Sequence, residues 1–189
     1  MVKVSKETAR KNHADILNAA SVSVREHGIG EASVAEIAQA AGLTHGALYR
    51  HFPTKNALVS AAISSSFEKI IDLLESLKNQ GQGKTAYVQT YLGTDHRDHF
   101  IWGCPVAPLA SEIHRLEPDV QMAFTDCLKL NIEALEKLIA SDDAAQSRSE
   151  AIATLATLVG AMAMARATKS VDENLSNEIL IAAKAHLSR

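Results

Sequence analysis

The stretch SVAEIAQAAGLTHGALYRHFPTK, residues 33 to 55, predicts two short helices joined by a tight turn. Ser33 is followed three positions later by Glu36, which forms a capping box: each side chain accepts a hydrogen bond from the backbone N–H of the other residue. Gly42 is expected to end this first helix, because glycine adopts the left-handed conformation of a helix terminus without a steric cost.

A second helix of barely two turns follows, with Thr44 as its N-cap and residues 45 to 51 as its body. Its apolar positions are too few to stabilise it alone, so it must pack on its neighbours. Its other face is free for a partner and carries Thr44, His45, Gly46, Tyr49, Arg50 and His51. Two short helices in this arrangement predict a helix-turn-helix, and therefore DNA binding.

Lys55 lies just beyond this motif, after Pro53 has stopped the second helix. It falls in the first turn of a third helix, where the helix dipole favours an acidic residue over a basic one. A phosphate docked on that helix end would take both the free N–H groups and the lysine charge. A merely solvated lysine is the alternative, and the neighbouring polar face of the second helix favours phosphate contact.

The segment GLTHGALYRHFPTKNALVSAA, residues 42 to 62, resembles the helix-turn-helix signature of the tetracycline-repressor (TetR) family of bacterial transcriptional regulators. The resemblance runs through both helices, the proline and the following lysine, and covers the N-terminal third of the chain. It implies that Thr44, His45 and Gly46 face base edges. It further implies that Tyr49, His51 and Lys55 hold phosphates and that Ser33 touches the DNA backbone.

The expected fold is all-α, with about nine helices, because helical periodicity recurs along the chain and no strand is convincing. A three-helix head with the helix-turn-helix is expected over residues 1–54, and a larger helical body for effector binding and dimerisation over 55–189. One long helix, residues 55 to 77, is expected to link them. Residues 93 to 99 are expected to form a polar loop.

Charge is divided along the chain in a way that suits this organisation. The formal net charge is −3. Residues 1–60 nevertheless hold seven Lys and Arg against five Asp and Glu, while the remaining residues hold twelve against seventeen. The basic excess lies where the motif lies, so the acidic body is not expected to touch phosphate.

A ligand pocket is expected in the body, where the bulky side chains of an aromatic-poor chain are gathered and where the Gly103-Cys104 stretch resembles the start of a cavity-lining helix in TetR-like bodies. A plain hydrophobic core is the alternative. The candidate lining residues are Phe67, Tyr87, Tyr91, Phe100, Trp102, Cys104, Met122 and Phe124.

The last two predicted helices, residues 144–168 and 174–187, carry more apolar surface than a small body needs. The resemblance implies that they pair with their counterparts in a second chain as a four-helix bundle, which makes the protein a homodimer. The candidate interface residues are Leu155, Leu158, Val159, Met162, Ile179, Leu180, Ala183 and Leu187.

Together these features predict a regulator, most plainly a repressor, that binds palindromic operator DNA as a dimer and is released by a small-molecule effector. Cys104 as a redox or electrophile sensor is one alternative, against which stands an inert buried thiol. An enzyme that uses Asp95, His96, His99 and Cys104 for metal or thiol chemistry is another, but the spacing of these residues and of Asp98 fits no established metal site. We therefore expect no catalytic residues, no metal and no cofactor.

A cytoplasmic location is expected, because the sequence has two cysteines, no CxxC pattern and no secretory leader. The most apolar run, residues 151 to 165, is shorter than the roughly 20 residues that a membrane span needs. It is therefore expected to be a buried helix, with no membrane as a partner.

Overall fold

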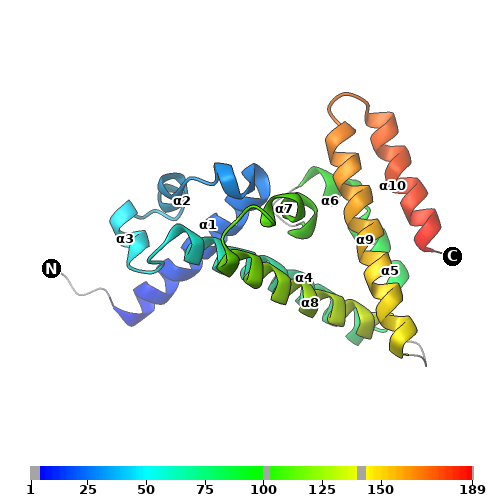
Figure 1. Ribbon diagram of the computed structural model, residues 1–189, viewed down its shortest axis with the longest axis horizontal. Coiled ribbons are helices and arrows are strands. Elements are labelled where there is room, and N and C mark those ends of the chain that lie inside the picture. Colours follow the sequence, from blue (N-terminus) through cyan, green and yellow to red (C-terminus); the bar gives the residue numbers. More distant parts are fainter. Residues whose placement is uncertain (1–4, 100–102, 140–143, 189) are drawn as a thin grey trace. The chain divides into compact units, whose positions relative to one another are not determined.

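The computed structural model describes residues 5–99, 103–139 and 144–188, and in these ranges the chain is all-helical with ten helices (Figure 1). Their bounds are α1 Lys6–Glu31, α2 Val34–Ala40, α3 His45–Tyr49, α4 Lys55–Asn79, α5 Lys84–Tyr91, α6 Thr94–Asp98, α7 Val106–Ile113, α8 Pro118–Leu138, α9 Ala144–Thr168 and α10 Glu173–Leu187. The predicted all-α class is confirmed. The expected polar loop over residues 93–99 is wrong, because α6 forms there.

The chain forms two compact units, which are described separately. Unit 1 comprises Met1–Ser66 and Pro108–Thr125, and unit 2 comprises Phe67–Ala107 and Asp126–Arg189. This division differs from the predicted domains 1–54 and 55–189, since helices α4, α7 and α8 each contribute residues to both units. The predicted functional domains stay a prediction.

The helix ends in unit 1 follow the predicted capping residues. The Ser33 hydroxyl accepts a 3.4 Å hydrogen bond from the N–H of Glu36 at the start of α2. Gly42 has a φ of +68° in the turn after α2, which is the left-handed conformation that the sequence predicts there. These two features set the direction in which the chain enters α3.

The core of unit 1 is built on one face of α1, where Ile16, Ala20 and Val24 are fully buried. Their spacing of four residues is that of a single helix face. A buried hydrogen bond of 2.6 Å between the hydroxyls of Ser21 and Ser66 joins α1 to α4. The short α3 contacts α2 and buries its Leu48, which provides the support that a helix of this length cannot supply for itself.

In unit 2, α9 and α10 lie side by side and antiparallel (Figure 1). Asp172 is the N-cap of α10 and accepts a 2.9 Å hydrogen bond from the N–H of Leu175. The apolar residues that α9 buries include Leu155, Leu158 and Met162. The helix pair is therefore a folded core element of unit 2.

Helix α9 is more apolar over a longer stretch than predicted. Ala145–Thr168, 24 residues, is long and apolar enough to cross a membrane by length and composition, and it is the one such helix in the part of the chain that the structure describes. The core helix of a globular protein passes the same test, so one such helix is weak evidence for a span. The buried face of α9 favours a core helix.

Candidate nucleic-acid interface and ligand cavity

Helix α3 presents a polar surface around a single buried anchor. Leu48 is 1% exposed and fixes the helix to unit 1, while the Thr44 hydroxyl caps it with a 3.3 Å hydrogen bond from the N–H of Ala47. The exposed positions are Thr44, His45, Gly46, Tyr49 and Arg50. The predicted contact residues Thr44, His45, Gly46, Tyr49 and Arg50 thus lie on α3 or at its ends, whereas Ser33 is the N-cap of α2, His51 follows α3 and Lys55 begins α4.

The rings of His45 and Tyr49 contact each other edge to face, with their centroids 4.9 Å apart. Tyr49 remains 38% exposed. Because the two residues are four positions apart, they lie on the same side of α3. Both rings are therefore available to a partner that covers this side of α3.

Lys55 is half-buried at the start of α4, and its ammonium group donates a 3.4 Å hydrogen bond to the Gly30 carbonyl oxygen. The preceding Thr54 hydroxyl accepts a 3.0 Å hydrogen bond from the N–H of Ala57 and so caps α4. The sequence predicts this lysine to hold phosphate, and it does not reveal the bond to Gly30. That bond holds the lysine stem at the helix end.

His13 of α1 lies against the end of the helix-turn-helix, a contact that the sequence does not predict. Its ring stacks on Phe52 with centroids 4.7 Å apart and approaches the His51 ring at 5.8 Å. The pKa of His51 is lowered, first by burial and then by the charges of His13 and Arg50. His51 therefore gives up its proton more readily than a free histidine does.

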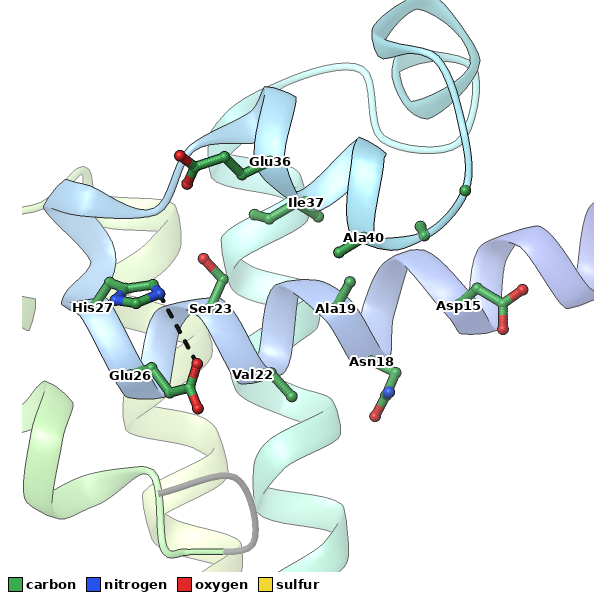
Figure 2. A pocket seen from close by; sticks show the side chains of 12 residues that line it. Asp15, Asn18, Ala19, Val22, Ser23, Glu26, His27, Glu36, Ile37 and Ala40 are labelled. Atoms are coloured by element: carbon green, nitrogen blue, oxygen red, sulfur yellow. Dashed lines mark ion pairs between the residues drawn. The ribbon is translucent and has the colours of Figure 1, made fainter. Parts of the chain in front are cut away.

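A groove of about 620 Å³ is lined by residues of both α1 and α2 (Figure 2). Its walls carry the carboxylates of Asp15, Glu26 and Glu36, and the His27 ring lies 3.9 Å from the Glu26 carboxylate. Like charge disfavours phosphate binding there. The acidic groove is therefore unsuited to a nucleic-acid backbone, in contrast to the face of α3.

Helix α1 is interrupted at Gly28, which has φ +79° and ψ 170°. The carboxylate of Glu112, on α7, accepts a 2.9 Å hydrogen bond from the N–H of Ile29 directly after the interruption. A Cβ atom at Gly28 would lie 2.5 Å from this carboxylate. The interruption needs glycine for its conformation, and any larger residue would also have to push the end of the Glu112 side chain aside.

Unit 2 contains a cavity of about 800 Å³ between α4, α5 and α6. Its walls combine apolar, aromatic and polar side chains. The lining residues are Ile70, Leu73, Tyr87, Gln89, Thr90, Tyr91, Gly93, Thr94, Asp95, His96 and His99. Its size is within the range of small-molecule sites.

His96 is held in one neutral form by its two hydrogen bonds. Its Nδ1 lies 2.5 Å from the Tyr91 carbonyl oxygen, and its Nε2 accepts a 3.0 Å hydrogen bond from the N–H of Cys104. Nδ1 is therefore the protonated nitrogen. Burial lowers the pKa of His96 to about 4, and the charge of Arg166 acts in the same direction. Neither nitrogen is free to bind a metal or act as a base.

Cys104 is 1% exposed, and burial raises the pKa of its thiol. The neighbouring Tyr91 side chain and the backbone at Val106 and Ala107 oppose this shift without reversing it. The thiol form is a poor nucleophile, and it is shielded from solvent. This environment favours the inert-thiol alternative over a reactive cysteine.

The predicted pocket residues are only partly brought together. Tyr87 and Tyr91 line the cavity, whereas the buried Phe67 and Cys104 do not. Met122 and Phe124 belong to unit 1, and Met122 is 61% exposed. Phe100 and Trp102 lie outside the described residues.

Arg97 anchors α6 to α10 from a buried position. Its guanidinium group donates hydrogen bonds of 3.0 Å to the Ser176 hydroxyl and 2.7 Å to the Asn177 side-chain oxygen. It also pairs with Asp98 at 2.7 Å, and together with Lys169 it lowers the pKa of that carboxyl to about 2. A charged residue in a polar segment gives no sequence signal of such burial.

Arg166 of α9 closes the C-terminal end of α6. Its guanidinium group donates hydrogen bonds of 2.6 Å to the His96 carbonyl and 3.2 Å to the Arg97 carbonyl. These carbonyls are among those that a helix end leaves without internal partners. Helix α6, which forms part of the cavity wall, is thus fixed to both α9 and α10.

The predicted interface residues on α9 and α10 lie mainly inside the chain. Leu155, Leu158, Met162, Leu180 and Leu187 are buried, and Val159, Ile179 and Ala183 are half-buried. Buried side chains have no surface left for a partner. The large apolar side chains that remain exposed on the described part of these helices are Ile152 (46%), Met164 (55%), Leu175 (41%) and Ile181 (66%).

Comparison with known proteins finds relatives of the segment that contains α2 and α3. The sequence pattern described as "Bacterial regulatory proteins, tetR family" matches residues 16–62. The HTH-type transcriptional regulator TtgR of Pseudomonas putida is 40% identical over 68 residues, which cover 36% of this chain and 32% of TtgR. The matched part therefore spans about a third of that relative's length.

Solved structures extend the similarity of fold to nearly the whole chain. A TetR-family regulator from Legionella pneumophila has a TM-score of 0.77 at 22% identity and covers 100% of this chain and 98% of its own. A TetR-family regulator from Agrobacterium tumefaciens has a TM-score of 0.75 at 23% identity, with 94% and 98% covered. At such identities the likeness establishes the fold.

Proposed function

This chain belongs to the TetR family of bacterial transcriptional regulators, and we propose that it is a dimeric repressor that binds a palindromic operator and releases it when a small molecule enters the unit 2 cavity. The observation that carries the proposal is the surface of α3, where polar and aromatic residues are exposed around the buried Leu48.

In this proposal α3 is the reading helix in the major groove. Thr44, His45 and Gly46, at its N-terminal end, face base edges, as the first residues of a recognition helix do. His45 offers a hydrogen-bonding ring there and sets the sequence preference. The backbone-contacting residues are Ser33, Tyr49, Arg50, His51 and Lys55, which set orientation and affinity.

Two copies of the chain are needed, since two reading helices about 34 Å apart match successive turns of the major groove. We propose that α9 and α10 pair with the same helices of a second chain. The interface then uses the exposed Ile152, Met164, Leu175 and Ile181 rather than the buried side chains of the same helices. Burying these four groups from water supplies the driving force.

The effector acts by preferring one shape of the body. A molecule that binds the cavity only when the reading helices are wrongly spaced lowers operator affinity by its differential affinity for the two shapes. The wall formed by α6 supports this role, because Arg97 and Arg166 fix α6 to the helices proposed to pair.

The alternatives are less well supported by specific contacts. A sensor based on Cys104 requires a reachable thiolate, but the thiol is buried and its pKa is raised. An enzyme based on His96 requires a free ring nitrogen, but both nitrogens are engaged. The described residues contain no group of three or more His, Cys, Asp or Glu placed to hold a metal ion.

The test is selection of bound DNA from a random pool, followed by gel-shift titration of the selected sequence. We expect a palindromic sequence with two half-sites, and at least roughly tenfold weaker binding by Tyr49→Ala on every sequence. Leu130→Ala, at an exposed position of α8, is the matched control and should bind as the unaltered protein does. Failure to enrich any sequence, or unchanged affinity in Tyr49→Ala, would refute the docking of α3.

A further inference from the structure

Three aromatic rings form a continuous wall of the unit 2 cavity. The Tyr87 and Tyr91 rings meet edge to face with centroids 5.7 Å apart, and the Tyr91 and His96 rings meet in the same way at 4.5 Å. All three residues line the cavity. Aromatic rings attract further aromatic rings in stacked or edge-to-face arrangements, so this wall favours a planar aromatic guest.

The inner part of the cavity is electrically neutral. His96 is uncharged at neutral pH because its pKa is about 4, and burial raises the pKa values of Tyr87 and Tyr91 well above their usual value. Neither lysine nor arginine is among the described residues that line the cavity, and the one carboxylate, that of Asp95, belongs to an exposed residue. The Arg166 guanidinium group lies near His96 but is engaged with the His96 and Arg97 carbonyl oxygens and does not line the cavity. An anionic guest would therefore lose its water without gaining a lining cation in return.

The Tyr87 hydroxyl adds a requirement for a hydrogen-bond acceptor. It is buried and has no hydrogen-bond partner within the described ranges. A buried hydroxyl left without a partner costs about 1–3 kcal/mol. The Tyr91 hydroxyl is also buried without a hydrogen-bond partner in these ranges, and burial together with the nearby Cys104 thiol raises its pKa. A guest that places an oxygen acceptor beside Tyr87 would form the hydrogen bond that this hydroxyl otherwise lacks.

From these three properties we infer that the cavity takes an uncharged, planar aromatic molecule that carries a carbonyl or similar hydrogen-bond acceptor, received by Tyr87. The inference rests on the proposed function, since it names the chemical class of the effector. The volume of about 800 Å³ admits a molecule of two or three fused rings with room for substituents.

The test uses four probes with the same naphthalene body and measures their binding to the full chain by isothermal titration calorimetry. These are 2-acetonaphthone, which is neutral and carries a carbonyl; naphthalene, which lacks the acceptor; 2-naphthoate, an anion; and 2-naphthylmethylammonium, a cation. We expect 2-acetonaphthone to bind most tightly, with an advantage of about tenfold or more over 2-naphthoate. No measurable binding of the ketone would overturn the inference, as would equal or tighter binding of either ion.

The variant Tyr87→Phe tests the acceptor requirement. It should weaken ketone binding about fivefold to tenfold and leave naphthalene binding unchanged, which reduces the ketone to the level of naphthalene. Because the lost hydroxyl has no partner in the described chain, its removal should not lower the thermal midpoint of unfolding. Thr125→Val removes an exposed hydroxyl on α8 and is the matched control. An unchanged preference for the ketone in Tyr87→Phe would overturn the role of Tyr87.

Operator binding separates a failure of this inference from a failure of the proposed function. Tight operator binding by a protein that prefers the anionic probe would refute the ligand class alone. If the protein binds the ketone preferentially but selects no DNA, the proposed regulatory function is refuted while the assigned ligand class is supported. The two results come from independent measurements on the same preparation.

Discussion

Arg97 of α6 and Ser176 of α10 are joined by a 3.0 Å hydrogen bond although they are 79 positions apart in the sequence. The same serine hydroxyl donates a 2.6 Å hydrogen bond to the Ala165 carbonyl of α9. Arg97, Ser176 and Ala165 therefore link one wall of the cavity to both C-terminal helices. A ligand that displaces α6 therefore has to break these hydrogen bonds or move α9 and α10 together with α6.

Replacing Arg97 by Met should lower the free energy of unfolding by about 2–4 kcal/mol, because it leaves several polar partners of a buried charge without their donor. Urea denaturation followed by circular dichroism measures this. Arg148→Met is the matched control, since Arg148 pairs with Glu136 at 3.3 Å in an exposed position. Exposed pairs contribute about 0–1 kcal/mol, so similar losses in both variants would contradict the anchoring role of Arg97.

Stability should fall between about pH 7 and pH 5 because of His96. Its pKa is about 4 in the folded chain, below the ordinary value of 6.5, so folding favours the neutral ring. The contribution is fully present above pH 6.5 and is lost as the pH falls through 4, by about 3 kcal/mol in total.

Urea denaturation at pH values from neutral down to about 5 tests this effect. His96→Gln, which keeps a hydrogen-bonding side chain but does not titrate, should flatten the dependence. His186→Gln, at an exposed position of α10, should retain it. A dependence of equal size in His96→Gln would assign the effect to other groups.

Operator affinity should rise as the pH falls from about 8 to 6, because of His51. In the free protein the pKa of His51 is lowered by burial, His13 and Arg50. A DNA phosphate beside the ring favours the charged form and raises that pKa, so DNA binding takes up a proton. As the pH falls, operator affinity therefore increases from near the pKa that His51 has in the DNA complex. It levels off below the pKa that His51 has in the free protein.

Gel-shift titrations at constant salt measure the effect, which we expect to be about threefold to tenfold. His51→Gln should bind with a much weaker pH dependence. His27→Gln, which alters the acidic groove between α1 and α2, should keep the full dependence. Equal slopes in the unaltered protein and in His51→Gln would exclude a phosphate contact by protonated His51.

The proposed pairing of α9 and α10 predicts that Ile181→Asp dissociates the dimer. Ile181 is 66% exposed, so a carboxylate there leaves the folded chain intact but has to be desolvated in the interface. Sedimentation equilibrium should show association weakened by about tenfold or more, with operator affinity lost in parallel.

Leu130→Asp is the matched control for this interface, because Leu130 is also apolar and 54% exposed but lies on α8. It should sediment as the unaltered protein does. If Leu130→Asp dissociates the dimer and Ile181→Asp does not, the interface lies on α8 rather than on α9 and α10.

Two neighbouring glycines should respond in opposite ways to alanine. Gly28→Ala places a Cβ at φ +79° and 2.5 Å from the Glu112 carboxylate, and it should cost about 1–3 kcal/mol of unfolding free energy. Gly30 has no atom within 4 Å of such a Cβ and no positive φ. Gly30→Ala should be neutral or stabilise by up to about 1 kcal/mol. Thermal unfolding of both variants measures the difference, and equal losses would contradict the close approach of Glu112.

Local chemistry makes much of the fold predictable. Ser33, Gly42 and Thr44 act at helix ends through their own backbone and side-chain geometry, so their positions in the sequence predict the ends of α2 and the start of α3. Helix α6 escapes prediction because Thr94–Asp98 is polar throughout and has no apolar periodicity. Its stability comes instead from bonds to α9 and α10, which are distant in sequence.

The faces of α9 are difficult to predict for a different reason. Alanine, leucine and methionine occur all around this helix, so periodicity does not distinguish its inner face from its outer face. Leu155 and Ile152 are both apolar, yet the first is 4% exposed and the second 46%. Only the packing of α10 and the rest of unit 2 decides between them.

The attachment of α3 through one side chain has a consequence for how this protein diverges. Leu48 is buried and holds the helix, whereas His45 is exposed and its ring contacts the exposed Tyr49 ring. If α3 reads DNA as proposed, a change at His45 should alter the preferred DNA sequence while the stability of the head is largely kept. Under the proposed function, duplicated copies of such a chain could acquire new target sequences one residue at a time. The exposed positions 45 and 46, rather than the helix cap Thr44, would then be the natural positions for engineering a new operator preference.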